Sequence, residues 1–213
     1  MENKKVYYRN YKDYSEYVEH QKSKLKIMDD ILKVYDKDYS QTLAGRLMGG
    51  GIIKQGMSVL CLGARIGTEV KAFFKRGCFA VGIDLITSKN NKYVLYGDFH
   101  DIQFPTDSVD IVFTNSIDHV FNLNKFLDEI KRVLKPEGYF IAEIVDSNVE
   151  DKKDLSQDAI ILQTSSIFES IFWEKADDVL DLIKGFKLIK RTSFEFPWEG
   201  EHCVFKNGER KNG

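Results

Sequence analysis

Residues 58–70, SVLCLGARIGTEV, decide the fold of this chain. A short apolar run ends at Gly63, a second glycine follows at Gly67, and a helical pattern begins immediately afterwards. This order predicts a strand, a tight turn and the start of a helix. Such a unit lets backbone approach a nucleotide-like cofactor in doubly wound α/β proteins, because glycine has no side chain in the way.

Outward from this unit, apolar strands alternate with helices. The sequence predicts strands over 59–62, 79–83, 93–96, 109–114 and 139–145, with helices over 68–75 and 125–134. The second helix is stopped by Pro136 and Gly138. Strands that are apolar along most of their length belong to a parallel sheet buried on both faces. We therefore expect an α/β fold with a Rossmann-like, mostly parallel sheet and helices on both faces. Two further strands, over 186–193 and 202–205, predict a C-terminal antiparallel hairpin.

The N-terminal part reads as helical. Apolar residues at steps of three and four predict a long amphipathic helix over 14–35. A polar stretch at 36–41 and a second short helix to residue 48 lead to a glycine triplet at 49–51. We expect a single domain over 1–213, with a helical cap at 1–51, a Rossmann-like core at 52–206 and a mobile tail at 207–213. Residues 175–184 predict a helix, and the apolar segments 159–162 and 167–173 fit helix or strand equally.

Composition limits the function classes. The chain has 213 residues, 43% of them hydrophobic, and a formal net charge of -2. These values fit one globular α/β domain and do not favour nucleic acid as an obligatory partner. No apolar run approaches the roughly 20 residues of a membrane span, so we expect no membrane partner. The three cysteines are odd in number and widely spaced, which fits a reducing cytoplasm rather than a disulfide framework or a metal site.

Asp84 follows the strand that comes after the glycine turn. A carboxylate at this place accepts hydrogen bonds from both ribose hydroxyls of a nucleotide-like cofactor. The alternative is an aspartate that caps a helix. The dinucleotide fingerprint is Gly-x-Gly-x-x-Gly, whereas this chain has Gly63-x-x-x-Gly67, so that class of cofactor does not fit.

Taken together, residues 56–145 resemble the broad methyltransferase-domain family of class I S-adenosylmethionine (SAM) dependent methyltransferases. The resemblance rests on the glycine turn, Asp84, the segment 104–112 and the helix with its Pro-Gly stop. It implies SAM as cofactor. In the family's motif an acid precedes glycines two, four and six positions later. Here Cys61 holds the acidic position and Arg65 the middle glycine.

Because of these two departures, the resemblance implies that other residues bind the methionine end of the cofactor. The acid of the family helps to hold the amino end of the cofactor, and Glu69 is a candidate replacement. Arg65 is placed to meet the methionine carboxylate or to cover the site, and its alternative is a solvent-facing loop arginine. The resemblance assigns Asp98 to the adenine amino group, with Phe99 beside the base, and the alternative for Asp98 is a turn-forming aspartate. The predicted cofactor site comprises Gly63, Ala64, Arg65, Gly67, Asp84, Leu85, Asp98, Phe99, Asn115 and Ser116.

His119 lies just past the predicted strand 109–114, where methyl donor and acceptor should meet. A neutral imidazole can take a proton from an acceptor hydroxyl or amine, so His119 is the candidate catalytic base. A structural histidine is the alternative, because alignment alone suffices for many methyl transfers. The pairs His100–Asp101 and Asp118–His119 could supply metal ligands, but nothing else supports a metal cage.

The acceptor stays open at this stage. The first hypothesis is an enzyme that methylates a small molecule, a sugar or a metabolite hydroxyl, carboxyl or amine. The second is an RNA or protein methyltransferase, for which lysines near the N-terminus give some support. The third is a catalytically silent fold that binds SAM or a partner. Tyrosines at 7, 8, 11, 14 and 17, with His20 and Gln21, pack against the core or fold over the cofactor as a lid.

Overall fold

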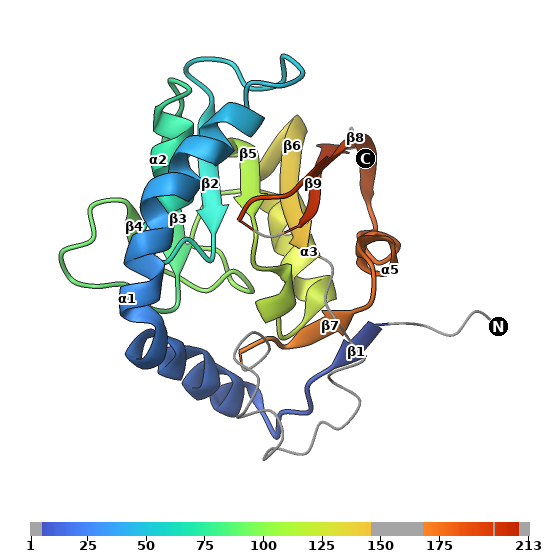
Figure 1. Ribbon diagram of the computed structural model, residues 1–213. Coiled ribbons are helices and arrows are strands. Elements are labelled where there is room, and N and C mark those ends of the chain that lie inside the picture. The colour runs from blue at the N-terminus through green and yellow to red at the C-terminus, as the bar shows by residue number, and fades with distance from the viewer. Residues whose placement is uncertain (1–5, 146–167, 198, 209–213) are drawn as a thin grey trace.

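The computed structural model describes residues 6–145, 168–197 and 199–208, and the side chains of 24–37 lie outside this description. Its centre is a seven-stranded sheet with the order β4-β3-β2-β5-β6-β9-β8 (Figure 1). The strands are β2 (Ser58–Leu62), β3 (Phe79–Asp84), β4 (Val94–Tyr96), β5 (Val109–Thr114), β6 (Leu134–Val145), β8 (Phe186–Phe194) and β9 (Gly200–Asn207). Neighbouring strands from β4 to β6 pair in parallel, and β9 pairs antiparallel with β6 and β8. The predicted Rossmann-like sheet with a C-terminal hairpin is confirmed.

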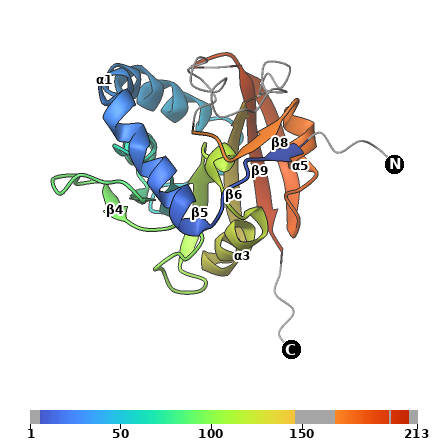
Figure 2. The same ribbon diagram turned by 90° about the horizontal axis from the view of Figure 1, so that it is seen from below.

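Helices cover both faces of the sheet. Helices α1 (Tyr14–Arg46) and α2 (Thr68–Phe74) lie on one face, and α3 (Leu123–Val133) lies on the other (Figure 2). Residues of β2 alternate between the two buried clusters: Val59 and Cys61 pack with α1 and α2, whereas Leu60 and Leu62 pack with α3. This alternation explains why β2 is apolar along its length, since each side chain meets a covering layer.

The N-terminal helix differs from the prediction. Instead of two helices separated by a polar stretch at 36–41, α1 runs unbroken from Tyr14 to Arg46. The stretch contains no Pro or Gly to interrupt it; Asp38 and Gln41 are exposed, whereas Ser40 is buried. Tyr39, Leu43 and Leu47 fall on one buried face at steps of four and join the cluster with α2. The C-terminal part of α1 is therefore part of the core packing.

A second, two-stranded sheet was not predicted. Strand β1 (Val6–Tyr8) pairs antiparallel with β7 (Ile171–Trp173), which assigns the ambiguous segment 167–173 to a strand over its last three residues. No local pattern announces this pairing, because its partners lie 160 or more residues apart in sequence. The helix predicted over 175–184 is shorter, as α5 (Ala176–Leu180). The segment 159–162 lies outside the described residues.

The tail begins later than predicted. Asn207 is the last residue of β9 and is 1% exposed, and its amide donates hydrogen bonds to the carbonyls of Leu134 and Lys135. Residue 207 therefore belongs to the sheet, and residues 209–213 lie outside the described part. Over the described ranges, none of the helices combines the length and the apolar character needed to cross a bilayer.

Candidate functional site

The pocket lies at the carboxyl ends of the central strands. Strand β2 lies between β3 and β5, so the order of the sheet reverses there, which is the position where open α/β sheets bind ligands. The pocket encloses about 50 Å³ and continues into open solvent. It is lined by Tyr17, Gln21, Gly63, Arg65, Asp84, Leu85, Ile86, Phe99, Ser116 and His119.

Seven of the predicted site residues are brought together by this pocket, and four are not. Gly63, Arg65, Asp84, Leu85, Phe99, Ser116 and His119 line it. Ala64, Gly67, Asp98 and Asn115 do not. Ile86 lines the pocket but was missed, although its place two residues after Asp84 could have signalled it. Tyr17 and Gln21 come from the first turns of α1, where the sequence predicted a covering segment.

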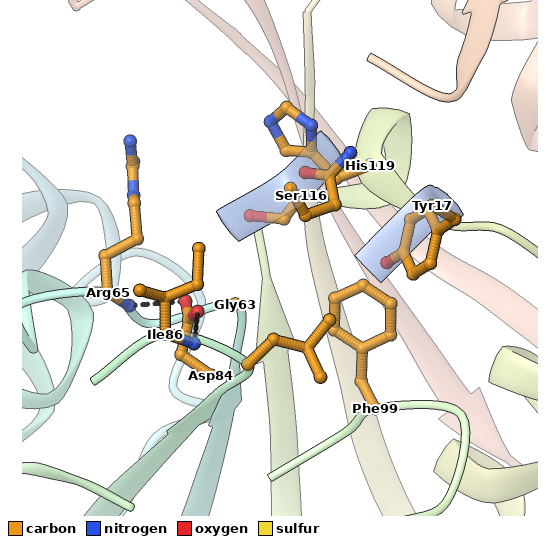
Figure 3. A pocket seen from close by; sticks show the side chains of 10 residues that line it. Tyr17, Gly63, Arg65, Asp84, Ile86, Phe99, Ser116 and His119 are labelled. Atoms are coloured by element: carbon orange, nitrogen blue, oxygen red, sulfur yellow. Dashed lines mark hydrogen bonds between the residues drawn. The ribbon is translucent and has the colours of Figure 1, made fainter. Parts of the chain in front are cut away.

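Asp84 fixes the loop that follows β2. Its Oδ2 accepts a hydrogen bond from the backbone N–H of Arg65 at 2.9 Å, and its Oδ1 accepts one from Ile86 at 2.8 Å (Figure 3). Each carboxylate oxygen can accept more than one hydrogen bond, so the side chain keeps capacity for ligand hydroxyls. Asp84 thus lines the pocket and holds the turn, and its predicted role toward a ribose stays a prediction.

The glycine turn is closely packed by the chain itself. Gly63 has φ +68°, and a Cβ there would lie 2.7 Å from Oγ of Ser116. Gly67 has φ +85°, and a Cβ there would lie 2.6 Å from Cβ of Tyr93. Both positions therefore require glycine for the fold as well as for any ligand. Arg65 is a non-glycine residue at φ +44°, a left-handed conformation that costs about 1–2 kcal/mol.

Asp98 lies behind the pocket wall, in a cluster with Tyr14 and His100. Its carboxylate accepts hydrogen bonds from the Tyr14 hydroxyl, from the His100 backbone N–H at 2.8 Å and from His100 Nδ1 at 3.0 Å. Burial alone would raise the pKa of Asp98, but these hydrogen bonds outweigh it and the pKa is lowered. On its other side, His100 Nε2 accepts the backbone N–H groups of Phe121 and Asn122. The protein thus uses both ring nitrogens of His100.

His119 ends the short 3-10 helix η1 (Ile117–His119), which follows β5. Its Nδ1 lies 2.9 Å from the carbonyl oxygen of Phe168. A carbonyl oxygen only accepts, so Nδ1 carries the proton in the neutral ring and the lone pair is on Nε2. Nε2 lies 3.6 Å from Oδ2 of Asp118, a carboxylate that stabilises the imidazolium form. This arrangement suits a ring that takes up a proton at Nε2.

The first turns of α1 contribute Tyr17 and Gln21 to the lining of the pocket. Gln21 Nε2 donates to the same Phe168 carbonyl at 2.7 Å. Tyr17 is completely buried, and its hydroxyl is turned toward the pocket, on the side opposite Arg65 (Figure 3). Among the described residues this hydroxyl has no hydrogen-bond partner, and burial raises the pKa of Tyr17, so the group stays a neutral donor. An unsatisfied buried hydroxyl costs about 1–3 kcal/mol, which a ligand atom could recover.

The candidate metal ligands do not form a cluster among the described residues. Within the part of the chain that the structure describes, no group of three or more His, Cys, Asp or Glu side chains is placed to hold an ion. The two ring nitrogens of His100 are engaged by Asp98 and by backbone N–H groups, which removes one of the ligand pairs considered from the sequence.

Comparison with known sequences gives a domain match. Residues 60–142 match a family model described as a methyltransferase domain. A sterol 24-C-methyltransferase of Gibberella zeae is 28% identical over 163 residues, which cover 67% of this chain and 40% of that protein. An uncharacterized protein of Methanocaldococcus jannaschii is 28% identical over 192 residues, 84% of this chain and 73% of its own length. The chain thus spans less than half of the length of the sterol methyltransferase.

Comparison with solved structures gives the fold. The 1,6-didemethyltoxoflavin-N1-methyltransferase of Burkholderia thailandensis, solved with bound 1,6-didemethyltoxoflavin and S-adenosylhomocysteine, aligns with a TM-score of 0.68 at 12% identity. The alignment covers 96% of this chain and 95% of that one. A chain from the Haloferax volcanii complex between a methyltransferase activator and a methyltransferase aligns with a TM-score of 0.61 at 19% identity, over 94% of this chain and 100% of that one.

Proposed function

We propose that this chain is a class I SAM-dependent methyltransferase and that it transfers the methyl group of SAM to a small molecule with a hydroxyl, carboxyl or amine. The observation that carries the proposal is the pocket at the carboxyl ends of β2, β3 and β5, partly covered by Tyr17 and Gln21 of α1. A site covered in this way suits an acceptor small enough to enter beside the cofactor.

The residues around the pocket fit a nucleoside cofactor. Asp84 supplies carboxylate oxygens for two ribose hydroxyls, and Phe99 supplies an apolar surface for the base. Gly63 and Ser116 form a close-packed floor, and the buried Tyr17 hydroxyl faces the pocket without a partner among the described residues. A ligand with acceptor oxygens or nitrogens would satisfy it. Asp98 would exchange its hydrogen bond from Tyr14 for one from the adenine amino group.

The first turns of α1 take part in this exchange. Tyr14 binds Asp98, and Tyr17 and Gln21 line the pocket, so one helix face covers both the adenine and the acceptor positions. The enclosed space of about 50 Å³ is smaller than the 300–1,000 Å³ of typical ligand sites. We expect this helix segment to move outward when the cofactor enters.

SAM supplies an electrophilic methyl group, and the chain supplies position and a base. The pocket walls align the acceptor with the methyl carbon, which removes much of the entropic barrier to the bimolecular step. His119, with its proton on Nδ1 held by Phe168, takes the acceptor's proton at Nε2. The nearby Asp118 carboxylate stabilises the resulting imidazolium.

The experiment separates the three acceptor classes. The protein is incubated with SAM carrying a labelled methyl group and, in parallel, with a metabolite extract, an RNA fraction and a protein fraction. The proposal expects label in a small molecule, identified by mass spectrometry. Label in RNA or protein would instead support a macromolecular acceptor. Cofactor binding without transfer to any fraction would support a silent SAM-binding fold.

A further inference from the structure

Position 61 cannot perform the task of the acid that the family motif places there. Cys61 is completely buried in β2. Burial, followed by the neighbouring Glu69 carboxylate, raises the thiol's pKa, so the side chain is neutral at physiological pH. A neutral thiol offers no charge to an ammonium group.

Glu69 is joined to the pocket floor by two hydrogen bonds. It is 2% exposed, in the first turn of α2, and its Oε1 accepts from Asn115 Nδ2 at 3.1 Å. Asn115 Oδ1 in turn accepts from the hydroxyl of Ser116 at 3.2 Å, and Ser116 lines the pocket. The path from Glu69 to the pocket therefore runs through one amide side chain.

The orientation of that amide follows from its partners. A carboxylate only accepts hydrogen bonds, so Asn115 must present its NH₂ group to Glu69 and its oxygen to the opposite side. A second donor bond from Nδ2 to the Tyr39 hydroxyl, at 3.2 Å, holds the same orientation. The Tyr39 hydroxyl donates to Glu143 at 2.7 Å and accepts from Asn115, so its direction is fixed as well. The Asn115 oxygen consequently faces Ser116, which lines the pocket.

We propose that Glu69 replaces the acid missing at position 61, by turning the Asn115 oxygen toward the amino end of the cofactor and placing a negative charge behind it. The inference rests on the proposed function, because it concerns the methionine end of the same site. Glu69 is a positioning residue, which acts through Asn115 and Ser116. Its effect should be confined to ligands that carry the amino-acid group.

Two ligands distinguish this role from a structural one. S-adenosylhomocysteine carries the amino-acid end, whereas 5′-methylthioadenosine has the adenosine and thioether alone. For Glu69→Gln, calorimetry should show affinity for S-adenosylhomocysteine reduced about tenfold or more, since a lost charge-assisted interaction is worth at least ~1.4 kcal/mol. Affinity for 5′-methylthioadenosine should stay within about twofold.

The matched control is Glu129→Gln. Glu129 accepts a hydrogen bond from the Ile102 backbone N–H at 2.6 Å and pairs with Arg132, so the variant removes a bonded carboxylate that has no contact with Asn115 or Tyr39. It should lower thermal stability but leave the ratio of the two affinities unchanged. Adding Cys61→Asp to Glu69→Gln returns a carboxylate to the motif position and should restore at least part of the lost affinity. If Glu69→Gln does not fold, this double variant and Glu69→Asp are measured in its place, and both should keep the wild-type preference for S-adenosylhomocysteine.

The outcomes separate the inference from the proposed function. Unchanged affinity for S-adenosylhomocysteine in Glu69→Gln overturns the role of Glu69, and so does an equal loss for both ligands. Loss of the wild-type preference in the two replacement variants also overturns it. A folded wild-type protein that binds neither ligand overturns the proposed function itself.

Discussion

The two walls of the pocket are held in different ways. The side proposed to take the adenosine, here the adenosine wall, comprises the lining residues Asp84 and Phe99, together with Asp98, which does not line the pocket. Each carboxylate accepts from the backbone N–H two residues onward, at Ile86 and His100, and each also accepts from one more distant residue, Arg65 or Tyr14. The side proposed for methyl transfer, here the transfer wall, comprises the lining residues Ser116 and His119, together with Asn115, which is bonded to Ser116, and it depends on distant elements. Asn115 bonds to Glu69, 46 residues away, and His119 to Phe168, 49 residues away.

This difference has a consequence for function. A wall whose polar atoms are fixed locally keeps its geometry when the rest of the chain varies, which suits the adenosine part common to all SAM-dependent enzymes. The geometry of a wall that is held by residues from distant segments can be altered by substitutions in any of those segments. In the proposed site, the two departures from the family motif, Cys61 and Arg65, fall at the methionine end of the cofactor, and Phe168 holds His119 on the proposed acceptor side.

The largest expected effect is on the transfer wall, at His119. His119→Gln can keep a hydrogen bond to the Phe168 carbonyl but removes the base, so turnover should fall about a hundredfold or more. Affinity for S-adenosylhomocysteine should hold. The wild-type rate should also fall as the pH drops and the imidazole becomes protonated, and this limb should be absent in the variant. A variant with near-normal turnover and the wild-type pH profile would return His119 to a structural role.

Next in size is Asp84 on the adenosine wall. Asp84→Asn removes the charge from the ribose site, and affinity should fall by about 1.5–3 kcal/mol, roughly tenfold to a hundredfold. In contrast to Glu69→Gln, the loss should be equal for S-adenosylhomocysteine and 5′-methylthioadenosine, because both carry the ribose. Calorimetry measures the two affinities, and thermal unfolding checks that the turn held by Asp84 survives. A loss for one ligand only would move Asp84 away from the ribose.

Replacing Arg65 should have a smaller effect, which raises stability and lowers cofactor affinity. Arg65→Gly relieves the left-handed conformation at φ +44°, and the free energy of unfolding should rise by up to about 1 kcal/mol. Affinity for S-adenosylhomocysteine should fall only about twofold to fivefold, since a partly exposed ion pair with the carboxylate contributes less than ~1 kcal/mol. Denaturant unfolding and calorimetry on the same preparation give both values. Unchanged affinity would leave Arg65 as a loop residue.

The smallest effect concerns Asp98 and its pH dependence. Its pKa is lowered in the folded state, so its contribution to stability is present above the unfolded value of about 4 and is lost as the pH falls through the folded value. Asp98→Asn should therefore cost on the order of 1 kcal/mol near neutral pH and progressively less in acid. Urea unfolding over a pH series measures this difference. A difference that stays constant with pH would contradict the assignment to the ionised carboxylate.

The features that the sequence predicts are the ones that depend on local patterns, and the features that it does not predict depend on contacts between distant segments. Local patterning predicts the succession of strands and helices along the chain and the glycine turn. It also predicts the places of Asp84 and His119 after their strands. The pairing of β1 with β7 and the contact of Phe168 with His119 could not be predicted, because they join segments 49 or more residues apart. The continuity of α1 is not predicted by the sequence pattern, because the polar stretch 36–41 interrupts the apolar spacing although the helix continues through it.

The central claim is that this chain binds SAM in the pocket beneath α1. Titration of the wild-type protein with S-adenosylhomocysteine in a calorimeter tests it most directly. The account predicts saturable binding at one site, displaced by SAM and weakened in Asp84→Asn. A folded wild-type protein that shows no saturable binding, or one whose affinity is the same in Asp84→Asn, would contradict it.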